Sequence, residues 1–230
     1  MTHMLETPKC RYDLIAFDVD GTLVTGPDQF TVWEVLNKHF TGTPDHNKER
    51  YAAYLAGKLS YADWVALDVT GWRDAGANRN DIIEALAPLK LIDGVRETMQ
   101  QLKATGAKLV VISGTLDLML ATLYPDHPFD EVYCNHLGFT DAGLIAHWNA
   151  TPFDMQGKAE ALRAVALRFE IPMSRCAFVG DSSNDVWIAQ LAGYSIAINP
   201  RSEKLIEAVD TVLHGDDFRV VLPHLLAGAD

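Results

Sequence analysis

Four short apolar segments recur along the chain with helical patterns between them, and this alternation limits the possible folds more than any other feature. The segments read YDLIAFD, AKLVVIS, CAFVGD and YSIAIN. Apolar runs of this length, separated by helical stretches, are typical of strands that are buried on both faces of a parallel sheet. The sequence therefore predicts an α/β doubly wound fold.

Two glycines follow helical patterns directly. Gly106 comes after GVRETMQQLKAT, and Gly193 comes after NDVWIAQLA. Glycine in this position commonly adopts the left-handed conformation that closes a helix. We expect both glycines to have that conformation.

Residues 25–87 interrupt the alternation, because they contain helical patterns but no run that reads as a buried strand. Aromatic and apolar side chains recur at helical spacing within them. We expect a small helical domain over residues 25–87, inserted after the first strand. Residues 1–24 and 88–230 would then form the α/β core.

The segment EVYCNHLGFTDAGLIAHWN contains two extended stretches around Asp-Ala-Gly. This pattern predicts a β-hairpin. The outer edge of such a hairpin can pair with a second copy or stay single, so the sequence leaves the oligomeric state open.

The chain is acidic, with a formal net charge of −12 over 230 residues. Nucleic acids and anionic membranes attract basic surfaces, so neither is an expected partner. No apolar run has the length needed to span a bilayer, and the N-terminal MTHMLETPKCRYD lacks the apolar stretch of a signal peptide. The three cysteines lack metal-ligand spacing. We expect a cytoplasmic protein with reduced thiols that acts on a small molecule.

Three of the apolar runs lead directly into polar residues. Ligands of an open parallel sheet gather at the carboxyl ends of its strands, so we expect these residues to meet at one crevice. Lys158, at the start of a helical stretch, could reach the same place. The residues after the three runs are Asp18 and Asp20, then Ser113 and Gly114, then Asp181, Asn184 and Asp185.

Each of these residues, taken alone, has an ordinary structural explanation: Ser113 can end a strand, and Lys158 can be a solvated surface lysine. Together they do not, because carboxylates from two strand ends repel each other unless a cation lies between them. An oxygen-only cluster suits Mg²⁺. Lys158 and Ser113 would offer a positive charge and a hydroxyl donor to an anion, and Gly21 and Gly114 would let backbone N–H groups approach it. A metal beside an anion pocket is what phosphoryl transfer requires.

In this order, DVDGT at residues 18–22, Ser113, Lys158 and GDSSND at residues 180–185 resemble the four motifs of the haloacid dehalogenase-like superfamily. The resemblance covers essentially the whole chain and implies a Rossmann-like core. The helical insertion resembles the cap of the subclass that contains phosphoserine phosphatase. The resemblance therefore implies a Mg²⁺-dependent phosphomonoester hydrolase for a small phosphorylated metabolite, with phosphoserine as the leading candidate.

The resemblance also implies a role for each motif residue. Asp18 would be the nucleophile that forms an aspartyl-phosphate, and Asp20 would be the general acid and base. Asp18 and Asp181 would bind Mg²⁺ through their side chains, Asp20 through its backbone carbonyl, and Asp185 directly or through water. The phosphate-binding set would be Ser113, Gly114, Lys158 and Asn184.

The insertion departs from the phosphoserine phosphatase pattern, in which a glutamate shortly after the first motif holds the substrate ammonium. This sequence has TLVTGPDQF there. Asp28 is a candidate substitute at a shifted register, and Arg73 is a candidate for holding a carboxylate; ordinary surface charge explains both at least equally well. The cap aromatics are expected to form its own small core, with Trp33 or Trp72 as candidates for lining the pocket.

Alternative activities differ from this one in specific residues. Typical haloacid dehalogenases need no Mg²⁺ and lack the second aspartate, which is Asp20 here. A phosphotransferase or phosphomutase would keep the same core and differ in the acceptor that the cap admits. A non-catalytic phosphoryl-binding module would have no need of Asp20. Phosphomonoester hydrolysis is therefore favoured, and phosphomonoesters other than phosphoserine remain open.

Overall fold

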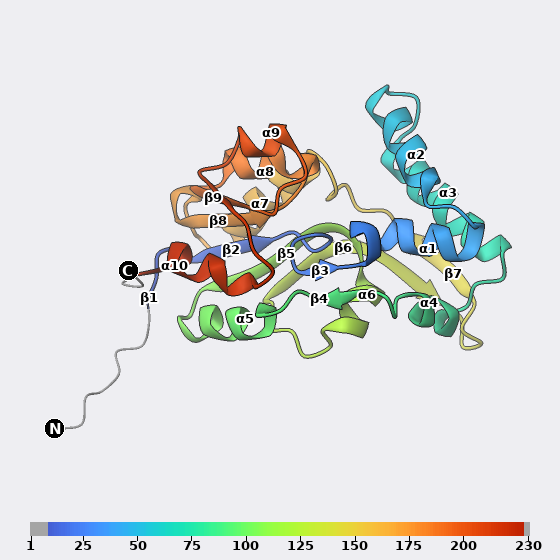
Figure 1. Ribbon diagram of the computed structural model, residues 1–230, viewed down its shortest axis with the longest axis horizontal. Coiled ribbons are helices and arrows are strands. Elements are labelled where there is room, and N and C mark those ends of the chain that lie inside the picture. The colour runs from blue at the N-terminus through green and yellow to red at the C-terminus, as the bar shows by residue number, and fades with distance from the viewer. Residues whose placement is uncertain (1–8, 228–230) are drawn as a thin grey trace.

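The structure is a computed structural model that describes residues 9–227, and seven strands form its central sheet (Figure 1). The strand order is β10-β9-β8-β2-β5-β6-β7, and every neighbouring pair is parallel except β6 and β7. This topology confirms the predicted α/β fold with a mostly parallel sheet. The strands are β2 (Leu14–Phe17), β5 (Lys108–Leu116), β6 (Glu131–Phe139), β7 (Ile145–Asn149), β8 (Cys176–Gly180), β9 (Tyr194–Ile198) and β10 (Thr211–Leu213).

Helices cover both faces of the sheet. The central strand β2 is buried along its whole length, with Leu14 and Ala16 in one apolar cluster and Ile15 and Phe17 in the other. The first cluster includes α7 (Gly157–Arg168), α8 (Val186–Leu191) and α9 (Glu203–Ile206). The second includes α5 (Val95–Ala104), α6 (Asp117–Leu123) and α10 (Leu222–Leu225). Burial on both sides explains why β2 reads as an uninterrupted apolar run.

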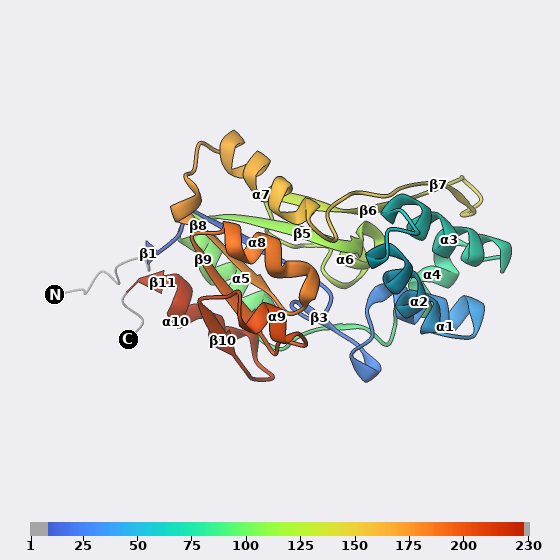
Figure 2. The same cartoon turned by 90° about the horizontal axis from the view of Figure 1, so that it is seen from above.

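Four helices gather at one end of the sheet, where α2 and α3 rise away from the body of the molecule (Figures 1 and 2). A short antiparallel ribbon of β3 (Val24–Thr25) and β4 (Lys90–Leu91) joins the chain before these helices to the chain after them. The helices are α1 (Val32–Thr41), α2 (Asp45–Leu55), α3 (Tyr61–Asp74) and α4 (Arg79–Ala85).

The predicted hairpin is present as β6 and β7, which pair antiparallel. Its tip is tied to the start of α4, because the backbone N–H of Arg79 donates to the carbonyl of Gly143 at 2.8 Å. The hairpin therefore extends the sheet to the four helices. The first and last strands of the described chain, β1 (Lys9–Cys10) and β11 (Leu226–Ala227), pair with each other.

The prediction for the two helix-terminal glycines is confirmed at one position and wrong at the other. Gly106 follows α5 with φ +86°, in the left-handed region. Gly193 does not have a positive φ; instead, a Cβ atom there would lie 2.5 Å from the carbonyl oxygen of Met173. Glycine is needed at 193 for close backbone packing and not for a left-handed turn.

Among residues 9–227 no helix combines the length and the apolar character needed to cross a bilayer. The three cysteines, Cys10, Cys134 and Cys176, are free thiols. Residues 1–8, on which most of the expectation about a signal peptide rests, lie outside the described part of the chain.

Candidate active site

The strands β5, β2 and β8 lie side by side and bring the motif residues to one crevice. Asp18 comes directly after β2, Ser113 lies in the C-terminal half of β5, and Asp181 comes directly after β8. Lys158 is the second residue of α7, which packs over the same strands. All four side chains are buried.

Lys158 is the central contact of this crevice. Its Nζ donates to Asp18 Oδ1 and to Asp185 Oδ1, both at 2.6 Å, and its side chain is 0% exposed. Burial alone would lower the pKa of Lys158, but Asp18 and Asp185 outweigh burial and raise it. The lysine is therefore a fixed positive charge beside the first aspartate.

Asp18, Asp181 and Asp185 form a buried carboxylate cluster in which one oxygen of each lies within 4.8 Å of the others. Burial, with the nearby Asp18, raises the pKa of Asp181 to about 8 and that of Asp185 to about 6. Uncompensated carboxylates so close together are costly, and hard divalent cations prefer oxygen ligands. The donor set and its burial therefore fit Mg²⁺.

Asp20 lies beside this cluster but outside it, and its side chain faces the start of α1. Its Oδ1 accepts the backbone N–H of Val32, the first residue of α1, at 2.7 Å. Burial and the charge of Asp18 raise the pKa of Asp20 to about 7. A carboxyl with such a pKa can both give and take a proton near neutral pH.

Ser113 and Gly114 lie at the end of β5 under the four helices. The Ser113 hydroxyl oxygen accepts the N–H of Thr115 at 3.2 Å, which leaves its proton available to another acceptor. The Gly114 carbonyl accepts from Trp33 Nε1 at 2.8 Å, a contact that ties α1 to this strand end. A Cβ at position 114 would lie 2.1 Å from the Asp154 carboxyl carbon, so only glycine fits.

The Asn184 side chain is engaged at both ends. Its Nδ2 donates to Asp154 Oδ1 at 2.8 Å, and its Oδ1 accepts from the Ser182 hydroxyl at 2.6 Å. Asn184 therefore connects the loop after β8 to the loop before α7. Sequence reasoning missed Asp154, which belongs to no motif and whose pKa is raised by burial.

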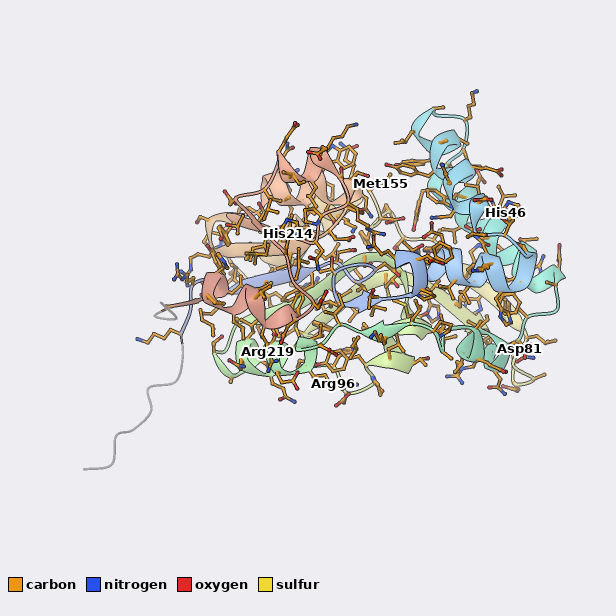
Figure 3. All side chains as sticks on the ribbon, viewed as in Figure 1. His46, Asp81, Arg96, Met155, His214 and Arg219 are labelled. Atoms are coloured by element: carbon orange, nitrogen blue, oxygen red, sulfur yellow. The ribbon has the colours of Figure 1, made fainter. Side chains whose placement is uncertain are left out.

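A cavity of about 460 Å³ opens over these residues. Its floor carries Asp18, Asp20 and Ser113, and its opposite wall comes from α1, α2 and α3. Met155, labelled in Figure 3, lies at its edge on the connection between β7 and α7. The wall from the helices consists of Trp33, Glu34, Asn47, Lys48, Tyr51 and Trp64.

Of the two tryptophans that were candidates for lining the pocket, Trp33 does so and Trp72 does not. Trp72 is completely buried, packs on Trp33 with 5.4 Å between ring centroids, and donates to Asn37 Oδ1. Trp64, which no sequence pattern singled out, lines the cavity in its place.

The structure does not bring Asp28 or Arg73 to this cavity. Asp28 is exposed in a short 3₁₀ helix at Pro27–Gln29, and Arg73 is exposed on α3, where its guanidinium lies over the Trp148 ring. Glu34 of α1 and Lys48 of α2 are the charged residues from these helices that do reach it. Glu34 had a local signal, since Thr31 and Glu34 form a capping box at the start of α1, whereas Lys48 had none.

Comparison with known sequences identifies the family. A profile of the haloacid dehalogenase-like hydrolases matches residues 12–193, a span that contains every motif residue described above. The chain belongs to this family. In this haloacid dehalogenase-like hydrolase, Asp18, Lys158 and the aspartates of the loop after β8 lie in spatial contact, as the motifs predict.

The most informative relatives of this haloacid dehalogenase-like hydrolase are phosphoserine phosphatases. SerB2 of Mycobacterium tuberculosis is 31% identical over 82% of this chain, and the match spans 44% of SerB2. The phosphoserine phosphatase of Streptomyces coelicolor is 28% identical, again with 44% of its length covered. That of Methanocaldococcus jannaschii is 25% identical, over 92% of this chain and 97% of its own. The chain thus spans less than half of the first two relatives and nearly all of the third.

Solved structures agree with the fold. A phosphoserine phosphatase determined as a phospho-aspartyl intermediate analogue superimposes with a TM-score of 0.75, at 24% identity, over 93% of this chain and 98% of the other. A substrate-bound phosphoserine phosphatase complex superimposes with a TM-score of 0.74, at 23% identity and the same coverage.

Proposed function

We propose that this chain is a phosphomonoester hydrolase that uses Mg²⁺ and forms an aspartyl-phosphate on Asp18. The observation that carries this proposal is the placement of the buried Lys158 Nζ, 2.6 Å from both Asp18 and Asp185 in a three-carboxylate cluster, where Asp18 also lines the cavity. A nucleophile, a fixed positive charge and a cation site meet there, which is the arrangement that phosphoryl transfer needs.

In the first half-reaction, an Asp18 carboxylate oxygen attacks phosphorus and the bond from phosphorus to the leaving oxygen breaks. Lys158 and the Ser113 hydroxyl hold the phosphoryl oxygens as negative charge moves onto the leaving oxygen. Asp20, protonated at the start, gives its proton to that oxygen, so an alcohol leaves. The α1 backbone N–H on Asp20 Oδ1 keeps the carboxyl directed at the site.

In the second half-reaction, Asp20 is ionised and accepts a proton from water as the water oxygen attacks phosphorus. The bond between phosphorus and Asp18 breaks, which frees the Asp18 carboxylate and inorganic phosphate. Asp20 is protonated again and ready for the next substrate. Its raised pKa suits a group that must hold and release a proton in each cycle.

The metal would be held by Asp18 and Asp181, with Asp185 nearby, and when bound it would neutralise charge on the transferring phosphoryl group. Lys158 pairs with Asp18 and Asp185, and Arg201 pairs with Asp181, so two cationic side chains face three carboxylates. The protein thus leaves negative charge in the cluster for a divalent cation to balance.

We further propose that residues 25–87 act as a cap and that the substrate is a small phosphorylated metabolite, with phosphoserine as the leading candidate. The names of the relatives support this choice. The cavity wall from α1 and α2 also supports it, because Glu34 and Lys48 present opposite charges there, as an amino acid would require. Neither Asp28 nor Arg73 is needed for this assignment.

The test is phosphate release from a panel of phosphomonoesters, including phosphoserine, with Mg²⁺ and with EDTA. Metal-dependent release that peaks at phosphoserine is the expected result. A peak at another ester would keep the chemistry and change the substrate. Transfer of phosphate to an added alcohol in place of water would indicate a phosphotransferase, and no release from any ester would favour a binding module.

A further inference from the structure

Arg201 belongs to none of the sequence motifs, yet it contacts the carboxylate cluster directly. It lies between β9 and α9, and its Nε donates to Asp181 Oδ2 at 2.6 Å. Its backbone N–H donates to the Asp181 carbonyl at 2.9 Å, and its Nη1 donates to the Gln29 carbonyl at 3.1 Å. Three hydrogen bonds therefore fix this arginine on one side of Asp181.

Asp181 has a different partner from the other two members of the cluster. Lys158 bonds to Asp18 and Asp185 and not to Asp181. Within residues 9–227, the ion pair of Asp181 is with Arg201, and its Oδ1 has only a long contact of 3.4 Å from the Thr22 hydroxyl. The orientation of the Asp181 carboxylate thus depends on Arg201.

The local backbone leaves room for this pair. Gly21 has φ +87°, and a Cβ there would lie 2.3 Å from Asp181 Oδ2 and 2.8 Å from Arg201 Nη2. The glycine of the first motif therefore lets the guanidinium and the carboxylate meet beside the turn after β2.

Arg201 also stands between two cavities. It lines the cavity over Asp18 and Asp20, and it lines a second cavity of about 440 Å³ whose wall includes Asp181, Gln29 and Lys90. Its side chain is 31% exposed, whereas that of Asp181 is 1% exposed. Arg201 thus lies at both cavities, next to a carboxylate that is itself almost completely buried.

We propose that Arg201 is a positioning residue for the divalent cation: it holds Asp181 in the orientation in which this carboxylate joins Asp18 and Asp185. The inference rests on the proposed function, because it assumes that the cluster binds Mg²⁺. Groups that hydrogen-bond to metal-binding carboxylates fix their orientation, and losing one typically weakens metal affinity roughly ten- to a hundredfold.

The test measures Mg²⁺ affinity by isothermal titration calorimetry of the full chain without substrate. Arg201→Gln is expected to weaken binding by roughly ten- to a hundredfold. Arg201→Lys is expected to lose less, because it keeps the charge without the geometry of the guanidinium. The matched control is Arg163→Gln, an exposed arginine on α7 that pairs with Glu160, and it should bind Mg²⁺ like the wild type.

Unchanged or tighter Mg²⁺ binding by Arg201→Gln would overturn the proposal, and tighter binding would mean that the arginine competes with the cation. A thermal melt in EDTA shows whether Arg201→Gln folds. If it does not fold, the Mg²⁺ affinity of Arg201→Lys tests the proposal, and an affinity equal to that of the wild type would contradict it. Wild-type protein that binds no Mg²⁺ would also overturn it. Wild-type protein that binds Mg²⁺ but hydrolyses nothing would refute the proposed function alone.

Discussion

At the residue scale, the surroundings of Asp18 determine how a substitution there should behave. Asp18 is 3% exposed and bonded to Lys158. Asp18→Asn removes the nucleophilic charge with almost no change of volume, and Lys158 keeps Asp185 as a partner. We expect turnover to be abolished and the fold to be intact, as measured by phosphate release and thermal melting. Residual turnover with the same metal requirement would point to another nucleophile.

Lys48 is a cation in the cavity wall for which the described residues show no carboxylate partner. If the substrate carries a second anionic group, Lys48→Gln should raise KM by about two- to fivefold, the effect of losing one exposed ion pair. Steady-state kinetics with phosphoserine measure this.

Lys58 provides the matched control, because it lies just beyond α2 and does not line the cavity. Lys58→Gln should leave KM unchanged. An equal rise of KM in both variants would indicate a general change of surface charge and not a contact with substrate.

At the element scale, Asp130 joins a helix to the sheet. It accepts from Lys103 Nζ on α5 at 2.6 Å, from the Leu109 N–H of β5 at 2.9 Å, and from Lys108 Nζ at 3.3 Å. Burial alone would raise the pKa of Asp130, but these three donors lower it below 3.8. Its charged form is therefore stabilised in the folded state.

The sign of the pH dependence follows from this lowered pKa. The stabilisation is present above the unfolded pKa near 3.8 and is lost as pH falls through the lower folded value. Asp130→Asn should reduce the free energy of unfolding by about 1–2 kcal/mol at pH 7 and by less at pH 3. Urea unfolding measures both, with Asp141→Asn in the exposed hairpin turn as a neutral control. A difference that persists undiminished at pH 3 would contradict the argument.

The helix α2 has no buried residue, and it is held by polar contacts and by the packing of Tyr51 and Tyr54 against Trp64. Arg50 pairs with the buried Asp68 of α3, and the Tyr51 hydroxyl meets the Ser183 hydroxyl of the loop after β8 at 3.1 Å. Tyr51→Phe removes the contact between α2 and that loop. One hydrogen bond contributes about 0.5–1.5 kcal/mol. If this bond holds α2 over the cavity when substrate binds, its loss should raise KM by roughly two- to tenfold.

Tyr54→Phe is the comparison for this helix, because Tyr54 also packs against Trp64 but has no hydrogen bond within the described residues. It should leave KM unchanged. Equal effects of the two substitutions would assign the role to aromatic packing and not to the link with Ser183.

For the fold as a unit, binding of the proposed Mg²⁺ would be coupled to folding, because the carboxylate cluster is assembled from two separate strand ends. A ligand that binds only the folded state at a hundred times its Kd adds about 2.7 kcal/mol. For a chain of this size, Mg²⁺ should raise Tm by roughly 5–10 °C relative to EDTA. Asp181→Asn should abolish this rise, and a rise that survives in the variant would place the bound cation elsewhere.

The core elements could be predicted because their causes are local. Strands buried on both faces leave uninterrupted apolar runs, and the polar residues that end them must converge where parallel strands end. This is why Asp18, Ser113 and Asp181 were expected at one crevice, where they lie. The left-handed conformation predicted for Gly193 after α8 was wrong, because glycine there serves close packing against Met173, which no local pattern shows. The division into core and cap stays a prediction.

Local sequence patterns thus specify the sheet, the hairpin and the motif side chains, whereas long-range packing specifies what surrounds them. Arg201 meets Gln29 across 172 positions, and Tyr51 meets Ser183 across 132. Such contacts join loops and helix surfaces that share no periodicity, so no local pattern announces them. For the same reason Asp28 and Arg73 could be proposed as substrate contacts from their charge, but only the packing of α1 and α2 over the strand ends put Glu34 and Lys48 at the cavity.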